Sequence, residues 1–184
     1  MADPTAPIWL TYKSRMNAER RLHRYGVVAH LAISWYSFLL IVFGIFQSKI
    51  NIATGTDVSP LAIVLSVLVF GLSLIFYGFR FEERAAKYRD CYLTLQRLYR
   101  SGAAVSKKMR EYTTLLERYP NHSETDFEQV VFESWRRATS IENAEGPIFV
   151  TKSLILKGYA RMVSWWLLLV IAFGGPLAAA AWLM

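Results

Sequence analysis

The sequence is poor in the residues that build catalytic and metal centres. Its single cysteine, Cys91, excludes an internal disulfide bond, and we expect it to be a small buried apolar residue. None of its three histidines has another at metal-ligand spacing, and no phosphate-binding loop, nucleophile elbow or dinucleotide fingerprint is present. We therefore predict no enzymatic activity, no metal and no cofactor. One alternative stays open: His122 or His23 approaching Cys91 would create a Cys/His nucleophile.

Charge is missing from three long stretches of the chain. Residues 60–79 and 162–184 have no charged side chain, and His30 is the only side chain in residues 27–46 that can ionise near neutral pH. A hydrocarbon core of about 30 Å requires about 20 helical residues, and each stretch is that long. We therefore predict three transmembrane helices. For the third, a tail that docks on other helices is the alternative, because Gly174-Gly175-Pro176 would kink it.

Basic residues are scarce in only one of the connecting segments. Lys49 is the only Lys or Arg in residues 47–59, whereas residues 1–26 and 80–161 carry many. The positive-inside rule places these two basic segments in the cytoplasm and residues 47–59 outside. Anionic membrane lipid accounts for the net charge of +7. We found no base-stacking motif, so direct nucleic-acid binding is disfavoured.

An apolar seam follows the second uncharged stretch. Its residues alternate spacings of four and three, which is typical of helices that bury a narrow stripe against partner helices. No helix breaker occurs between Phe79 and Pro120, although Gly102 is a weak point or a place of close helix contact. We predict a continuous, self-associating stalk over residues 80–119. The candidate oligomerisation seam is Cys91, Leu95, Leu98, Gly102, Val105, Met109, Tyr112 and Leu116.

Two further helices are expected beside this stalk. Residues 8–25 carry Tyr12 on an apolar side, and they either lie on the inner leaflet or pack on the stalk. Ser123 and Asp126 form a capping-box pattern at the start of a helix over residues 124–142. The apolar face of this second helix is expected to pack back on the stalk.

Small and hydroxyl-bearing residues form a stripe on each of the first two predicted spans. Such stripes either let helices pack closely and hydrogen-bond, or line a water-accessible path once several hairpins assemble. His30 is a further candidate, because ionisable groups inside membranes are often functional. The candidate pore-lining or helix-packing residues are His30, Ser34, Ser37, Gly44, Ser66 and Ser73.

Three segments resemble the SLATT proteins, the SMODS- and SLOG-associating two-transmembrane effectors. They are residues 12–22, residues 88–96, and residues 119–123 before Asp126-Phe127. The resemblance covers nearly the whole chain and is best to the branch associated with reverse transcriptases. It implies a pore-forming effector in antiviral bacterial conflict systems, where a sensor or nucleic-acid-synthesising enzyme triggers membrane damage that stops phage spread. It supplies no catalytic residues.

The sequence thus predicts an all-α membrane protein with a transmembrane hairpin, a long cytoplasmic helical stalk and a third transmembrane helix. We expect a homo-oligomer in the bacterial inner membrane, in contact with lipid, whose activation causes growth arrest or cell death. The hairpin of residues 27–79 would form the membrane assembly. A reverse transcriptase or nucleotide-signalling protein is the expected trigger. The alternative is a non-conducting membrane anchor that recruits a cytosolic enzyme through the stalk.

Overall fold

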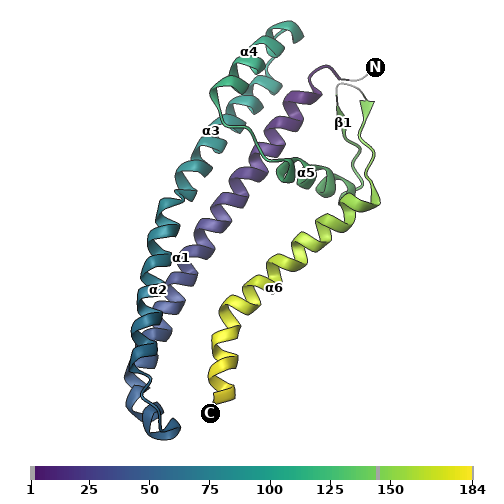
Figure 1. Cartoon of the computed structure of the whole chain (residues 1–184). Coiled ribbons are helices and arrows are strands. Elements are labelled where there is room, and N and C mark those ends of the chain that lie inside the picture. Colours follow the sequence, from purple (N-terminus) through teal and green to yellow (C-terminus); the bar gives the residue numbers. More distant parts are fainter. Residues whose placement is uncertain (1–2, 144–145, 184) are drawn as a thin grey trace. The chain divides into compact units, whose positions relative to one another are not determined.

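The fold is almost entirely helical, as the sequence predicts. The computed structural model describes residues 3–143 and 146–183, and its six helices account for most of them (Figure 1). One short antiparallel strand pair, which the sequence did not indicate, pairs Asn143 with Gly146. The elements in chain order are α1 (Ala6–Thr54), α2 (Ser59–Gly78), α3 (Phe81–Arg100), α4 (Val105–Arg118), α5 (Glu124–Arg136), β1 (Glu142–Asn143), β2 (Gly146–Pro147) and α6 (Lys152–Leu183).

The chain divides into two compact units. The first, here called the core unit, consists of the residues up to His23 together with Glu82–Leu167. The second, the apolar unit, consists of Arg24–Phe81 together with the chain from Leu168. Nearly all described buried apolar side chains belong to the core unit, and Ala29 is the exception in the apolar unit. The two units are therefore built differently: one has a hydrophobic core, and the other leaves its apolar side chains uncovered.

The start of α1 forms the centre of the core unit. Ile8 and Tyr12 of α1 pack against Cys91 and Leu95 of α3, and three of these four side chains are completely buried. Of the two predictions for residues 8–25, packing on residues 80–119 is therefore the one that the structure shows. Side chains around this cluster come from α1, α3, α4 and the residue after α4: Trp9, Tyr92, Tyr99, Met109, Tyr112, Leu115 and Tyr119.

The prediction of one continuous helix over residues 80–119 is wrong. The helix is interrupted at residues 79–80, where Arg80 has a positive φ of 47°, and again at residues 101–104. After the second break α4 runs back along α3: Lys108 Nζ donates to the carbonyl of Tyr99, and Tyr88 Oη donates to the carbonyl of Asn121. The break follows from tertiary packing, because the reversal brings the apolar side of α4 onto α1 and α3.

A capping box starts α5, as predicted. The Ser123 hydroxyl accepts from the backbone N–H of Asp126, and the Asp126 carboxylate accepts from the backbone N–H of Ser123. The helix ends at Arg136, earlier than predicted, and no described α3 side chain belongs to the cluster that contains its Val130 and Val131. Val130 and Val131 instead cluster with Leu10 of α1 and with Ile141. α5 therefore belongs to the layer formed by α1 and the segment that leads into α6.

In the apolar unit, the turn between the first two long helices is shorter than predicted. α1 continues to Thr54, so residues 47–54 of the predicted outer loop are helical, and Gly55 has the positive φ of 66° that the turn requires. α2 begins at Ser59, and Val58 is the residue at its N-cap. Asp57 accepts hydrogen bonds from the Ser59 backbone N–H and hydroxyl, which gives one of the free N–H groups at this helix start a partner.

The third long helix is continuous through its Gly-Gly-Pro sequence. α6 begins at Lys152, ten residues before the predicted span, and passes Pro176 without a break; residue 184 of the predicted span lies outside the described residues. Proline has no N–H to donate to the carbonyl four residues earlier, here that of Ala172. The Tyr36 hydroxyl of α1 donates to this carbonyl at 2.8 Å. The hydrogen bond replaces the missing one and joins α6 to α1.

Candidate functional site

A buried arginine lies at the centre of the core unit. Arg15 of α1 is completely buried and donates through Nη1 to the Cys91 thiol. Its Nε and Nη2 have no hydrogen-bond partner among the described residues, and neither has the neighbouring Ser14 hydroxyl. A buried guanidinium with two unused donors is unusual, because a buried charge is normally paired. Arg15 therefore places a charge with two unsatisfied donors in an otherwise apolar contact, which is unfavourable for the stability of the core unit.

The groups around Arg15 are held neutral. Burial raises the pKa of the Cys91 thiol, and the nearby Arg15 charge only partly opposes this rise. Burial lowers the pKa of His122, and the Arg15 charge lowers it further. A neutral, buried thiol is a poor nucleophile, and no hydrogen bond joins His122 to Cys91 in the described part of the chain. The Cys/His alternative has no support in this arrangement.

A second buried charge on α5 is fully paired. The carboxylate of Asp126 is 2% exposed and accepts hydrogen bonds from Arg21 of α1, from Nε at 2.9 Å and Nη2 at 3.0 Å. Burial alone would raise the pKa of Asp126, but hydrogen bonds from Arg21 and Ser123 lower it below its ordinary value. The carboxylate is ionised at neutral pH and fixes α5 to α1.

In the sequence, Arg15 and Arg21 belong to the basic segment over residues 1–26 that predicts the orientation of the first span. A signal for the burial of Arg15 was present in the spacing of α1. Ile8, Tyr12, Arg15 and Leu22 repeat at spacings of four, three and seven, so Arg15 occupies a position of an apolar stripe. The structure buries all four side chains. An arginine on such a stripe predicts a buried charge.

The predicted oligomerisation seam is divided between buried and exposed positions. Cys91, Leu95 and Leu98 are buried within the chain, and Met109 and Tyr112 pack on the same cluster. Leu116 is half-buried, whereas Gly102 and Val105 are exposed. The 4-3 pattern thus marks a real apolar stripe, and much of it is covered by α1 and α4 of the same chain.

In the described part of the chain, no hydrogen bond joins the predicted stripe residues of the two spans to one another. Ser66 and Ser73 donate to carbonyls of their own helix, those of Ala62 and Phe70. His30 Nδ1 lies 2.8 Å from the carbonyl oxygen of Gly26 on its own helix. Side-chain exposure separates the six residues into two groups: His30, Ser34, Gly44 and Ser66 are exposed, and Ser37 and Ser73 are half-buried.

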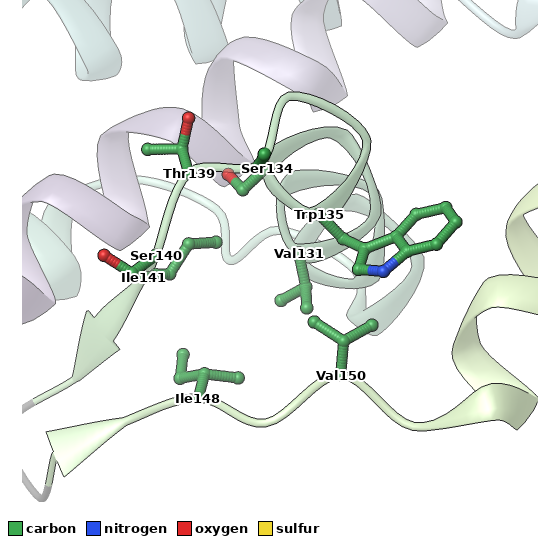
Figure 2. Close-up of a pocket in the computed structure, with 9 residues that line it drawn as sticks. Val131, Ser134, Trp135, Thr139, Ser140, Ile141, Ile148 and Val150 are labelled. Carbon is green, nitrogen blue, oxygen red and sulfur yellow. The ribbon is translucent and has the colours of Figure 1, made fainter.

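A small pocket lies between α5 and the chain that follows it (Figure 2). It has a volume of about 230 Å³ and a mainly apolar wall that includes Val131, Ile148 and Val150. Figure 2 shows the side chains of these residues converging on the pocket, with the hydroxyls of Thr139 and Ser140 on the adjoining segment. No charged residue lines it, so it offers no acid–base chemistry.

Metal-binding geometry is also missing from residues 3–143 and 146–183. No group of three or more His, Cys, Asp or Glu side chains there is arranged to hold a metal ion. Three stretches of the described chain are instead long and apolar enough to cross a membrane. They are Ala6–Ala53, Ser59–Arg100, which includes the break at residues 79–80, and Lys152–Ala178. Only 6%, 0% and 6% of their most apolar windows are buried inside the chain. Apolar helices of this length, with so few residues covered by the rest of the chain, identify a membrane protein.

Comparison with known proteins relates the chain to a family of membrane effectors. The family model described as SMODS and SLOG-associating 2TM effector domain family 5 matches residues 5–182. The match covers most of both units and all six described helices, except for the last residue of α6. No curated protein and no solved structure matches the chain.

Proposed function

We propose that this chain, which belongs to the SMODS and SLOG-associating 2TM effector domain family 5, is a non-enzymatic effector that forms a pore in the bacterial inner membrane. The observation that carries the proposal is the contrast between the two units. The core unit packs its own apolar residues, whereas α2 has no buried residue along its whole length. The apolar unit therefore requires lipid, other subunits, or both to cover its helices.

The proposed topology follows the distribution of charge. Residues 1–26 and 80–161 lie in the cytoplasm, and the short turn at residues 55–58 lies outside. The Lys49 ammonium lies 5.8 Å from the centre of the Phe46 ring near that turn, a position compatible with an interface. The core unit is then available to cytoplasmic partners. α6 would return the chain to the outer face, which makes a third span in a family described by two.

Oligomerisation in this proposal depends mainly on the spans. Cys91 and Leu95 are already buried against α1, and Leu98 is also buried within the chain, so these residues are unavailable to another subunit while the core unit is closed. The exposed stripe residues of α1 and α2, among them Ser34 and Ser66, remain available for contacts between subunits. These residues pack between hairpins when the pore is shut and line the conducting path when it is open.

The proposed trigger is a separate cytoplasmic partner, either a reverse transcriptase or a nucleotide-signalling protein. The described pocket in the core unit is small, apolar and without charged lining, which is unsuited to a nucleotide. Sensing is therefore assigned to the partner, and the effector contributes membrane disruption, growth arrest and cell death.

The experiment follows membrane potential in bacteria that express the chain with its genomic neighbours during phage infection. We expect depolarisation before lysis, and its loss in Ser37→Leu plus Ser66→Leu, because leucine would fill both stripes. The matched control is Val64→Leu plus Val67→Leu, which enlarges exposed side chains off the stripe of α2. Dying cells that keep their potential would contradict pore formation. If the cells are still protected from phage after all three spans are replaced by unrelated ones, the result would instead support the alternative of a non-conducting membrane anchor.

A further inference from the structure

Helix α5 is bound on two sides by charged contacts to two different helices. Asp126 holds Arg21 of α1, and Glu128 holds α6 through Lys157 Nζ at 3.2 Å and Arg161 Nη2 at 2.7 Å. Arg161 Nη1 also donates to the backbone carbonyl of Thr125. The two acids are two residues apart, so one turn of α5 connects α1 with α6 (Figure 1).

The contact between α5 and α6 depends on one glycine. A side chain at Gly158 would begin 2.4 Å from Phe132 Cδ2, far inside contact distance. Phe132 is buried there and meets the ring of Tyr159 edge-on, with 5.3 Å between ring centres. The missing side chain lets the two helices approach, and any larger residue at this position must push them apart.

The two sides of α5 differ in how strongly they are held. On the α1 side the acceptor carboxylate is 2% exposed, and the bond from Arg21 is bidentate. On the α6 side Glu128 is 17% exposed, and its partners Lys157 and Arg161 are 61% and 35% exposed. Exposed ion pairs contribute little, whereas breaking a buried pair is strongly unfavourable. Separation of α5 should therefore occur at α6 while α5 stays with α1.

We propose that the α5–α6 contact is an autoinhibitory latch, and that its release is the step by which a cytoplasmic partner activates the proposed pore. The inference depends on that proposed function. α6 is a single helix from Lys152 into the third apolar stretch, so a change at Gly158 or Arg161 acts on the same rigid element that enters the membrane. While the latch is closed, α6 cannot shift relative to α1 in the core unit.

The test uses the full chain in liposomes with an entrapped dye, without any partner. Gly158→Leu should open the latch and raise the leakage rate by roughly tenfold or more, because overpacking of this size forces the helices apart. Ala160→Leu, an exposed neighbour on α6, is the matched control and should leave leakage unchanged. Glu128→Gln removes the charge without adding volume and should raise leakage by about threefold, which keeps the test valid if Gly158→Leu does not fold.

Spin labels on α5 and α6, at Arg136→Cys and Leu156→Cys in a Cys91→Ala background, report the latch directly. The distance between them should lengthen or broaden in Gly158→Leu and Glu128→Gln but not in Ala160→Leu. An unchanged distance would overturn the latch. So would a lengthened distance without leakage, if the wild-type chain conducts when its partner is added. Failure of every variant and of the triggered wild type to conduct would instead refute the pore, and the latch with it.

Discussion

Replacement of Arg15 by methionine should stabilise the core unit. Arg15 is completely buried, yet its guanidinium makes one hydrogen bond, to a neutral thiol, and two of its nitrogens have no partner among the described residues. Methionine is similarly long and unbranched, has a comparable helix propensity, and adapts to irregular apolar space. The substitution thus removes a poorly compensated charge and keeps most of the packing against α3.

The magnitude follows from the groups that are removed. Each unsatisfied buried donor costs about 1–3 kcal/mol, and the hydrogen bond to Cys91 contributes about 1 kcal/mol. Allowing for imperfect packing of methionine, the net gain should be about 1–4 kcal/mol. A gain of 1 kcal/mol raises the melting temperature of a chain of this size by about 2–4 °C. Arg15→Ala should instead destabilise the unit, because it leaves a cavity.

Cys91 supplies the assay, because it is the chain's single cysteine and is completely buried in the core unit. A thiol-reactive fluorogenic dye labels it only after the unit opens, so the midpoint of labelling on heating reports core-unit stability in detergent or lipid. Arg20→Met is the matched control, since Arg20 is exposed on the same helix. A lower midpoint for Arg15→Met with an unchanged control would show that the guanidinium is well solvated or paired, and would refute the reasoning.

Three further outcomes are expected. Tyr36→Phe should leave the Ala172 carbonyl of α6 without a donor and weaken the α1–α6 contact by about 1–2 kcal/mol, which faster amide exchange in α6 would show. Tyr77→Phe, at an exposed position, is the control and should not change this exchange. Equal exchange in Tyr36→Phe and the unmodified chain would contradict the assignment. Ala138→Gly should stabilise the end of α5 by about 1 kcal/mol in the thiol assay, since Ala138 has a positive φ of 53°. Because the folded pKa of Asp126 is depressed, its stabilisation should be complete above about pH 4 and lost as pH falls through the folded pKa; thermal midpoints from pH 7 to pH 3 check this, and Asp126→Asn should reduce the dependence.

The spans were predictable because lipid imposes simple demands on a chain. Twenty uncharged residues satisfy the length of the hydrocarbon core whatever the neighbouring helices do. The helical prediction for α2 therefore agrees closely with the structure. The capping box at Ser123 was predictable for a similar reason, because its two hydrogen bonds are local.

The break at residues 101–104 could not be read from the same pattern. Ser101 and Gly102 are compatible with a helix and with a turn, and the 4-3 spacing continues across them. The choice is made by distant contacts, such as Lys108 with Tyr99 and Tyr112 with Thr11 of α1. A single-sequence pattern gives the apolar stripe but does not say whether its partner is another subunit or the same chain folded back.

The sequence did not reveal the burial of Arg15 or the pairing of Arg21 with Asp126, because the positive-inside rule already accounts for basic residues near a span. Likewise, Gly158 carries no signal in the sequence, since its role depends on Phe132, far away along the chain. The contacts that the sequence did not reveal are therefore those between α1, α5 and α6, which the proposed latch requires.

Because Arg15 and Arg21 precede the first span, they act twice during biosynthesis: first in orienting the chain in the membrane and later in the packing of the core unit. The ribosome releases them before the first span, and in the proposed orientation their charge retains the amino terminus in the cytoplasm while the hairpin inserts. Their folded partners, Cys91 and Asp126, are translated only later, after both spans of the hairpin. Maturation of the core unit must therefore wait for the nascent chain to reach α5, so a chain truncated before that helix would insert its hairpin yet lack a closed core unit.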